Sequence, residues 1–356
     1  MAPRLRFLVF GAGAVGTYVG GSLALHGYPV VFLTRPKTAA ELHRTGLRLA
    51  LGARDFHLGD YHIEEPVTAT SLDDALHLAS FDVVILALKS FDTQAAIEAM
   101  LPFSDSLPAI LSLQNGVENE PALARAFGAS RVIAGTLTSA IARRGPGDIA
   151  LERLRGSGIA GDHPLSTSLA TAFNLSGLNT RIYANALEMK WSKLLANLLG
   201  NATSAILDMT PVEVFSDSRS FQIEVRQLRE ALAVMGAQGL RPVDLPGTPV
   251  RALAFAIQYL PAPLFRPLMA RAIGGGRGGK MPSFHIDLHA GRGKTEVDYL
   301  NGAVARFGEQ LGIPTPVNRI LNETLQALAR GDLPLDEYAR QPGKLLERVR
   351  GKDSWG

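Results

Sequence analysis

The chain has 356 residues, of which 46% are hydrophobic, and carries a formal net charge of +3. Its length exceeds that of a usual single domain and its composition provides for a sizeable core, so we expect two domains. The small charge argues against a nucleic-acid partner, the lack of cysteine excludes disulfides, and no apolar segment is long and glycine-poor enough to span a membrane.

A glycine-rich turn follows the first apolar run, Leu5 to Phe10, and precedes a helical stretch and a second strand at 28–33. In the G-x-G-x-x-G spacing the first glycine permits a tight turn, the second lets the backbone approach a pyrophosphate, and the third lets helix pack on strand. Free N–H groups at the helix N-terminus favour the anion. We therefore predict a dinucleotide-binding turn formed by Gly11, Gly13, Ala14, Val15 and Gly16.

The same N-terminal segment permits a second interpretation. Arg4 and Arg6 precede an apolar stretch, as in a signal peptide. However, five glycines lie between Gly11 and Gly21, and only four apolar residues separate Arg6 from the first of them. The pattern therefore favours the nucleotide fold.

The second strand ends at Thr34-Arg35, where a dinucleotide fold usually carries an acidic residue about 20 residues beyond the glycines. A carboxylate there binds a ribose 2′-hydroxyl, whereas a guanidinium can bind a 2′-phosphate through two hydrogen bonds. Arg35 therefore predicts NADP rather than NAD. The alternative is a solvated arginine at a strand end.

Three further apolar runs, 82–88, 109–113 and 131–136, lack strict alternation, as parallel strands buried on both faces do. Lys89 follows the first run and Asn115 follows the second. Because ligands bind at the carboxyl ends of such strands, we expect both residues at the same rim as the glycine turn. A solvated lysine and a simple Asn-Gly turn are the alternatives.

The segment 145–161 is rich in turn residues and predicts antiparallel strands at the edge of this first domain. Beyond Tyr183 the periodicity becomes helical, and we expect one long helix over 184–207.

Polar residues recur every four positions along this expected helix, at Lys193, Asn197 and Asn201, and Lys190 and Ser204 extend the stripe. The remaining positions are strongly apolar, so the helix should be buried, and buried amide and ammonium groups need partners. An anionic, oxygen-rich substrate would provide them. A polar stripe that faces solvent is the alternative.

Downstream, Ser283, Asp287 and Glu296 precede an apolar helix that runs through Leu311. Taken together, the chain resembles the ketopantoate reductase family. The resemblance rests on the glycine turn, Arg35, Lys89, Asn115-Gly116, Lys193-Leu194, Asn197, Asn201, Ser283, Asp287, Thr295-Glu296-Val297-Asp298 and Leu300-Asn301-Gly302. It spans nearly the whole chain, and its motifs are specific as a set.

The resemblance implies an α/β fold, with an N-terminal Rossmann-type doubly wound sheet (1–183) that binds NADP and an all-α C-terminal substrate domain (184–356). It implies reduction of 2-dehydropantoate by NADPH in the cleft between them. By the same similarity Lys193 is the general acid, and Glu296 binds the substrate hydroxyl and helps to orient the lysine. The substrate would be held by Asn197, Asn201 and Ser283. The cofactor and carboxylate side of the site would be lined by Lys89 and Asn115.

Two departures from the family pattern leave the substrate more open than the reaction. The spacing from Asp287 to Glu296 is one residue longer, and Arg241 to Lys280 reads as a proline-rich insertion. A reductase of another 2-keto or 3-keto acid and a non-catalytic NADP-sensing module are therefore alternatives. We expect a small keto-acid substrate, no membrane partner and a cytoplasmic location. The sequence does not decide whether the chain forms a homodimer.

Two short motifs match a phosphate-binding loop and a metal site only in part. Gly274 to Lys280 fits G-x-x-x-x-G-K, but Met281 replaces the Ser or Thr that would hold Mg²⁺, so we predict a loop or hinge. His285, Asp287 and His289 alternate as metal ligands on a strand can, yet the match is short and hydride transfer needs no metal. We expect no metal site here and assign Asp287 a capping or structural role.

Overall fold

The computed structural model describes residues 4–58, 67–261, 266–267, 269–271, 280–291 and 293–352. The chain divides into two compact units, the first made of residues 1–190 and 245–248 and the second of 191–244 and 249–356. In the part that the structure describes, no helix has the length and apolar character needed to cross a membrane. The cytoplasmic location stays a prediction.

The first unit is built on an eight-stranded sheet with the order β12-β11-β8-β7-β6-β1-β2-β5. Its neighbouring strands are parallel, except for β11 against β8. The six strands from β5 to β8 follow the Rossmann order 3-2-1-4-5-6, which confirms the predicted fold class. The strands are β1 (Phe7–Phe10), β2 (Val30–Leu33), β5 (Val67–Ala69), β6 (Val83–Leu86), β7 (Ala109–Ser112), β8 (Val132–Leu137), β11 (Ser157–Ala160) and β12 (Thr180–Tyr183).

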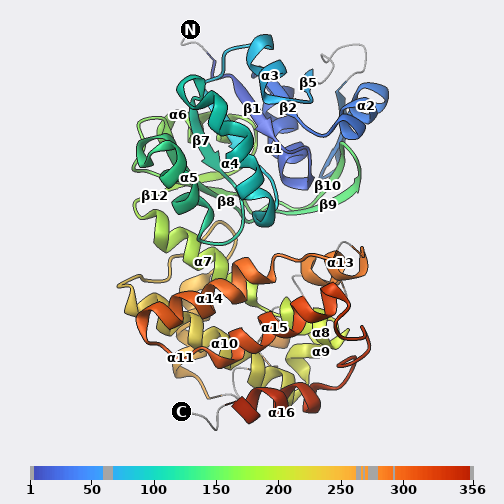
Figure 1. Cartoon of the computed structure of the whole chain (residues 1–356), viewed down its shortest axis with the longest axis vertical. Helices are drawn as coiled ribbons and strands as arrows, with labels where there is room; N and C mark the ends of the chain where they lie inside the picture. The colour runs from blue at the N-terminus through green and yellow to red at the C-terminus, as the bar shows by residue number, and fades with distance from the viewer. Residues whose placement is uncertain are drawn as a thin grey trace. The chain divides into compact units, whose positions relative to one another are not determined.

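Helices cover both faces of this sheet, because the strand residues are apolar on both sides. On one face α1 and α6 pack against Phe7 and Val9, and on the other α3, α4 and α5 pack against Leu8. In Figure 1, α4 and α5 lie together in front of the strands. The helices and 3-10 turns are α1 (Ala14–Leu25), α2 (Pro36–Thr45), α3 (Leu72–Leu78), η1 (Ser90–Asp92), α4 (Thr93–Met100), η2 (Leu101–Ser106), α5 (Asn119–Phe127), η3 (Ala129–Arg131) and α6 (Ser166–Leu175).

A second, four-stranded sheet with the order β4-β3-β10-β9 packs against α1. Its strands are β3 (Leu47–Leu51), β4 (Arg54–Leu58), β9 (Ala140–Gly145) and β10 (Asp148–Arg153). The prediction of antiparallel strands over 145–161 is correct in direction, since β10 pairs with β9 and β11 pairs with β8 in that sense. Both strands belong to the first unit, β10 in this separate sheet and β11 between β8 and β12 of the larger one.

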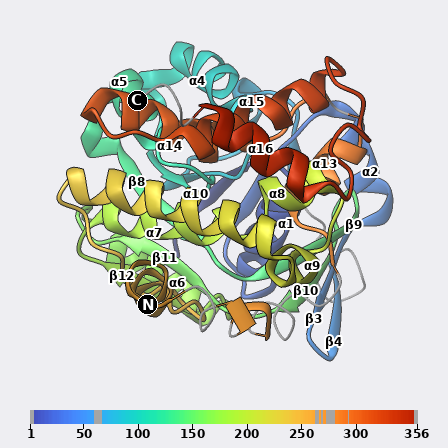
Figure 2. The ribbon, with the colours of Figure 1, turned by 90° about the horizontal axis from the view of Figure 1, so that it is seen from below.

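The second unit is helical. Helix α10 is its longest described helix, and Figure 2 shows it along its length with α16 beside it. The helices are the C-terminal part of α7 (Ala186–Leu198), α8 (Ala202–Leu207), α9 (Pro211–Ser216), α10 (Ser218–Ala237), α11 (Val250–Tyr259), α13 (Ser283–His289), α14 (Val297–Leu311), α15 (Pro316–Arg330) and α16 (Pro342–Lys352). The predicted helix that ends at Leu311 is confirmed.

The single helix predicted over 184–207 is wrong. Helix α7 ends at Leu198 and α8 begins at Ala202, and Gly200 between them has φ +59°. This left-handed conformation suits glycine, which lacks the Cβ that disfavours it in other residues. The periodic apolar pattern continues across the break and therefore hides it.

A buried carboxylate holds this break in place. Glu224 of α10 is fully buried, and its Oε2 accepts a hydrogen bond from the Gly200 N–H at 2.9 Å. Its Oε1 accepts from the hydroxyl of Thr203 and, at 2.8 Å, from the side-chain amide of Gln227. The backbone N–H that the helix break exposes thus has a charged acceptor, whose bond is stronger than that of a neutral one.

Part of the predicted insertion belongs to the first unit. Residues Leu245 and Thr248 form an isolated bridge, and the carbonyl of Pro246 accepts a hydrogen bond from Thr138 Oγ1 at 2.9 Å. The next residues form α11 in the second unit. The glycine-rich Gly274 to Lys280 motif lies outside the described residues, apart from Lys280 itself.

We expect Glu224→Gln to lower the free energy of unfolding by about 1–3 kcal/mol, because an amide NH₂ then faces a donor that it cannot satisfy in the protein interior. Urea titration followed by circular dichroism measures the change. The same substitution at exposed Glu323 on α15 is the control, with an expected change within about 0.5 kcal/mol. Equal effects of the two substitutions would contradict a role for the buried carboxylate.

Candidate functional site

The three glycines of the predicted turn have the conformation or the surroundings that the motif predicts for each of them. Gly11 has φ +108°, a conformation that other residues rarely adopt. A Cβ on Gly16 would lie 1.8 Å from the carbonyl oxygen of Gly11, so only glycine lets α1 pack this closely. A Cβ on Gly13 would meet nothing within 4 Å. The backbone at Gly13 is therefore open to a ligand, directly before the N–H groups of Ala14 and Val15 at the start of α1.

The turn lies at the point where the order of the sheet reverses. Strand β1 has β2 on one side and β6 on the other, and the chain crosses over between them. A Cβ on Gly11 would lie 2.7 Å from Leu88 Cδ2, so the segment after β6 adjoins the glycine turn. Ligands of open α/β sheets bind at this switch point, outside the carboxyl ends of the strands.

Arg35 lies at the carboxyl end of β2 and forms the N-cap of α2, with Pro36 at the first helical position. Its side chain is exposed. Among the described residues, none forms a hydrogen bond or ion pair with the guanidinium. An arginine at a helix N-terminus without an acidic partner favours an anionic ligand.

Lys89 and Asn115 follow adjacent strands, and a buried polar network joins the two segments. The side-chain amide of Gln114 donates to the carbonyl of Lys89 at 3.3 Å, and the hydroxyl of Ser90 donates to the carbonyl of Asn115 at 2.8 Å. Asn119 at the start of α5 donates to the same carbonyl at 2.6 Å. The structure thus brings Lys89 and Asn115 to one rim and fixes their backbones. Asn119 was not among the predicted residues, although its spacing of four residues from Asn115 is a usable signal.

Lys190 has a different environment from the other polar residues of its stripe. Its side chain is only 3% exposed, and Nζ donates to the carbonyls of Gln114 at 2.6 Å and Gly135 at 3.3 Å. Nζ also lies 2.7 Å from Glu120 Oε1. The first unit therefore uses this ammonium to hold the segment that carries Asn115.

Lys193 and Asn197 share one face of α7, one helical turn apart, and both are half-buried. The apolar residues around them, Trp191, Leu194, Leu195 and Leu198, are fully buried. Trp191 packs edge-on against Phe307 of α14, with ring centroids 5.3 Å apart. The helix that carries the two polar residues is thus anchored by its apolar side.

Asn201 is not on that helix, contrary to the prediction, because it follows the break at Gly200. Its Oδ1 accepts the backbone N–H of Phe284 at 3.1 Å, which satisfies a free donor in the first turn of α13. Its Nδ2 lies 3.5 Å from Ser283 Oγ. The structure therefore brings Asn201 and Ser283 together, 82 residues apart in sequence, and gives Asn201 a capping role that the sequence analysis missed.

Glu296 directly precedes α14 and is 3% exposed. Its neighbour in the motif, Asp298, has a structural role, because its Oδ1 accepts hydrogen bonds at 3.0 Å from Arg306, Asn322 and Gln326. Asp287 lies inside α13 and is buried, so it does not cap that helix. The segment through His285, Asp287 and His289 is helical and not a strand, so α13 places the two histidines on one face and Asp287 on another.

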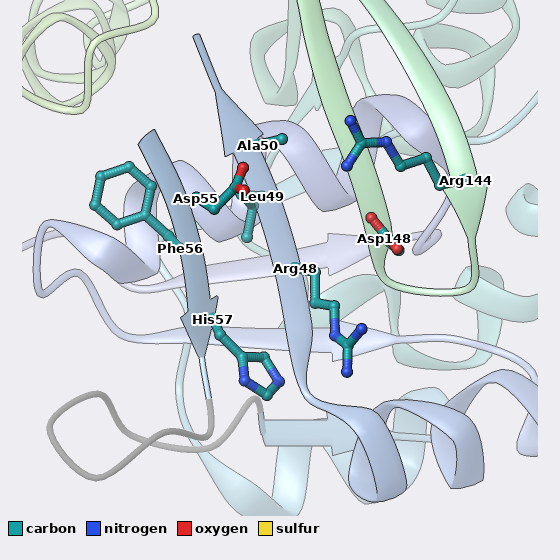
Figure 3. Close-up of a pocket in the computed structure, with 8 residues that line it drawn as sticks. All are labelled: Arg48, Leu49, Ala50, Asp55, Phe56, His57, Arg144 and Asp148. Carbon is teal, nitrogen blue, oxygen red and sulfur yellow. The ribbon is translucent and has the colours of Figure 1, made fainter. Parts of the chain in front are cut away.

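A pocket on the small sheet contains none of the predicted site residues (Figure 3). Its walls come from β3, β4, β9 and β10, and include Arg48, His57, Arg144 and Asp148. Because arginines and aspartates both line it, the pocket has no net preference for an anion.

Comparison with known proteins gives consistent matches for both units. The family model described as ketopantoate reductase PanE/ApbA matches residues 7–164, and the model of its C-terminal part matches residues 185–329. A 2-dehydropantoate 2-reductase of Halobacterium salinarum is 28% identical over 341 residues, which cover 92% of this chain and 99% of the relative.

Solved structures share the fold. A PanE/ApbA family ketopantoate reductase from Ralstonia eutropha JMP134 has a TM-score of 0.76 at 28% identity, covering 92% of this chain and 99% of the other. A D-mandelate dehydrogenase solved with NADH and anilino(oxo)acetate has a TM-score of 0.74 at 20% identity, with the same coverage. The latter likeness concerns the fold alone.

The glycine turn yields a paired prediction. We expect Gly13→Ala to fold with a stability within about 1 kcal/mol of the unsubstituted protein, because its methyl group meets no protein atom. Affinity for a dinucleotide should fall at least about tenfold, since the methyl group blocks the backbone's approach to the pyrophosphate. Thermal unfolding and fluorescence titration with NADPH measure the two effects.

Gly16→Ala is the contrasting variant, in which the methyl group meets the Gly11 carbonyl inside the protein. Here we expect a loss of about 1–3 kcal/mol or more in the free energy of unfolding. Unchanged dinucleotide affinity in Gly13→Ala would contradict the assignment of this turn.

Proposed function

The chain belongs to the ketopantoate reductase family, a family of nicotinamide-dependent oxidoreductases that act on a CH–OH group, and we propose that it reduces 2-dehydropantoate to pantoate with NADPH. The match to both parts of the family model, together with Lys193 and Asn197 on one face of α7, carries the proposal. In it the first unit binds the dinucleotide and the second binds the keto acid.

The residues of the first unit fit a dinucleotide. Gly13 is open on the side of its missing Cβ, the first turn of α1 contains no acidic residue, and its free N–H groups can bind the pyrophosphate. Lys89 and Asn115 would line the nicotinamide and carboxylate side. When bound, the nicotinamide supplies a hydride to the ketone carbon of the substrate.

The preference for NADPH rests on Arg35. Its exposed guanidinium at the N-terminus of α2 suits a 2′-phosphate, and Lys37 adds a second positive charge in the first turn. Neither of these positions offers the carboxylate that would bind a ribose 2′-hydroxyl.

Lys193 is the proposed general acid. Negative charge develops on the carbonyl oxygen as the carbon receives the hydride, and an ammonium at that oxygen both stabilises the charge and donates the proton. Glu296, buried at the start of α14, would accept a hydrogen bond from the substrate hydroxyl and orient the lysine.

Asn197, Asn201 and Ser283 would hold the rest of the keto acid. Because Oδ1 of Asn201 already accepts the Phe284 N–H, its part in binding falls to the Nδ2 group beside the Ser283 hydroxyl. This arrangement presents donors to the carboxylate or hydroxyl oxygens of an acid substrate.

A panel of 2-keto and 3-keto acids, with consumption of NADPH as the readout, tests the proposal. Turnover of 2-dehydropantoate with the highest kcat/KM is the expected result. Turnover of another acid alone would assign the chain a different substrate, and tight NADPH binding without any turnover would indicate a sensing module.

We expect Lys193→Ala to bind NADPH with unchanged Kd and to lose about 10² to 10⁴ in kcat, the usual contribution of general acid catalysis. Lys193→Arg keeps the positive charge but cannot give up a proton, so it should recover little of the rate. Lys344→Ala, at an exposed position of α16, serves as the control. Stopped-flow single turnovers report the chemical step, and an unchanged rate in Lys193→Ala would remove this residue from the mechanism.

Arg35→Ala should weaken NADPH about tenfold to hundredfold, as expected for the loss of charge-assisted hydrogen bonds, while KM for NADH stays within about twofold. Arg44→Ala removes another exposed arginine of α2, one that pairs with Glu41, and should leave the ratio of the two cofactors unchanged. Steady-state kinetics with both cofactors measure this ratio. Equal efficiency of the unsubstituted enzyme with NADPH and NADH would contradict the role of Arg35.

A further inference from the structure

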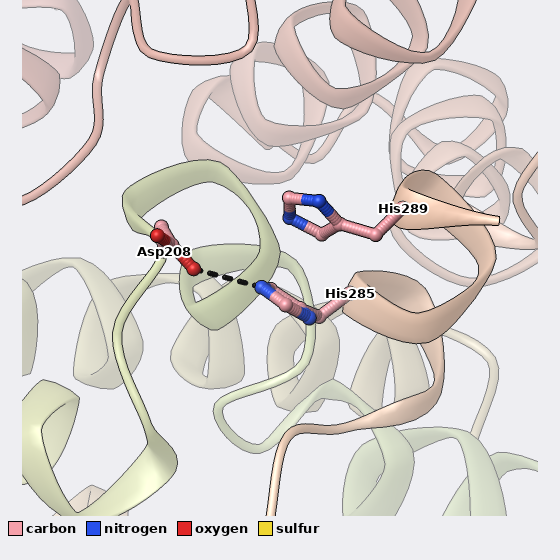
Figure 4. A group of neighbouring side chains, drawn as sticks. All are labelled: Asp208, His285 and His289. Carbon is pink, nitrogen blue, oxygen red and sulfur yellow. Dashed lines mark hydrogen bonds and ion pairs between the residues drawn. The ribbon is translucent and has the colours of Figure 1, made fainter. Parts of the chain in front are cut away.

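Three side chains outside the proposed reductase machinery gather where α8 ends and α13 passes it. Asp208 follows α8, and His285 and His289 lie on α13 (Figure 4). His285 Nε2 lies 2.8 Å from Asp208 Oδ1, and the two imidazole rings have centroids 4.1 Å apart. One ligand atom from each residue lies within 4.8 Å of the others.

The local fold accounts for this grouping. His285 and His289 are four residues apart on a helix and therefore share a face, the spacing with which two histidines on one helix ligate zinc. Asn201 ties α13 to the start of α8 through the Phe284 N–H. Because α8 is short, its other end, with Asp208, lies against the histidine-bearing face of α13.

Asp208 stands where a carboxylate is unfavourable without a cation. Its φ of +48° is in the left-handed region, which Asp and Asn adopt more readily than most other residues with a side chain. It also follows the C-terminal end of a helix, where the partial negative charge of the carbonyls repels an anion. The neighbouring Arg340 does not neutralise it, since its guanidinium pairs with Glu213 at 3.1 Å. Within the described residues, His285 is the one hydrogen-bonding partner of this carboxylate.

The two imidazole rings lie side by side, with centroids 4.1 Å apart, and one nitrogen of each lies near the Asp208 carboxylate. His289 forms no hydrogen bond with any described residue. A metal ion would bind both imidazoles and supply a positive charge beside the carboxylate.

We propose that Asp208, His285 and His289 form a binding site for a divalent transition metal of the Zn²⁺ type, with water completing the coordination. Two imidazole nitrogens and one carboxylate oxygen are a ligand set that Zn²⁺ accepts. Bonds of about 2.0–2.1 Å in a tetrahedral site place ligand atoms about 3.3 Å apart. The ligand atoms now lie within 4.8 Å of one another, and the Asp208 and His289 side chains are exposed, so they have room to rotate toward that spacing.

The bound metal would act as a clamp between α8 and α13. It joins the C-cap of α8 to the third and the last residue of α13, whereas Asn201 and Ser283 join the N-terminal ends of the two helices. The site does not depend on the proposed reaction, so its test uses binding and stability and not turnover.

The test uses the full chain without a histidine tag, treated with a chelator and dialysed. Calorimetric titration with ZnCl₂ should give one ion per chain, and CoCl₂ should give visible absorption bands of nitrogen-ligated Co²⁺. The thermal midpoint should rise with added Zn²⁺, because the ion binds the folded state.

His289→Gln and Asp208→Asn each remove one ligand with little change in size, and asparagine tolerates the left-handed conformation at 208. We expect each to weaken Zn²⁺ at least about tenfold. His77→Gln is the matched control, since His77 is also exposed and lies 3.6 Å from a carboxylate, that of Asp73, without a second histidine. It should bind Zn²⁺ as the unsubstituted chain does.

No uptake of Zn²⁺ or Co²⁺ at millimolar concentration would overturn the proposal. So would uptake that both cluster variants retain undiminished, because the ion would then be bound elsewhere. Circular dichroism of the variants verifies that they fold, so a loss of binding reports the ligand and not the fold.

Discussion

The close approach of α1 to the turn before it is the constraint on which the dinucleotide side of this protein depends. A Cβ at Gly16 would lie 1.8 Å from the Gly11 carbonyl oxygen, so the first turn of α1 can lie over the end of β1 only with glycine at this position. Because of that packing, the free N–H groups of α1 lie at the point where the strand order of the sheet reverses. The polar network from Ser90 to Asn119 then fixes the neighbouring rim. Backbone packing thus shapes the turn, and buried polar side chains hold the segments beside it.

Much of the first unit could be predicted from the sequence, because its signals are local. The apolar runs 82–88, 109–113 and 131–136 correspond to β6, β7 and β8, and the glycine spacing fixes the turn whatever surrounds it. The four-stranded sheet was harder to foresee, since it joins two hairpins by pairing β3 with β10, whose partner residues, such as Arg48 and Asp148, are far apart in the chain. Pairing between distant segments leaves no mark in local periodicity.

The second unit shows why a polar stripe on a helix is an incomplete guide. Lys190 and Lys193 look alike in sequence, yet Lys190 is bound by two carbonyls and Glu120 in the first unit. Asn201 fits the spacing, yet a glycine at 200 ends the helix before it. Gly200 could have indicated the break, since an isolated glycine within a helical pattern often marks the end of the helix. The contacts of Asn201 with Ser283 and Phe284, and of Asp208 with His285, depend on α13 and could not be read from either segment alone.

The two groups of the Asn201 side-chain amide contact different parts of α13, and this limits which substitutions the position can accept. Its Oδ1 stabilises the first turn of α13 while its Nδ2 faces Ser283. Any substitution of Asn201 removes an acceptor from a buried N–H, at a cost of about 1–3 kcal/mol. Ser283 is exposed and carries no such burden. Under the proposed binding roles of both residues, accepted changes in acid selectivity should therefore accumulate at 283 before 201 over evolutionary time.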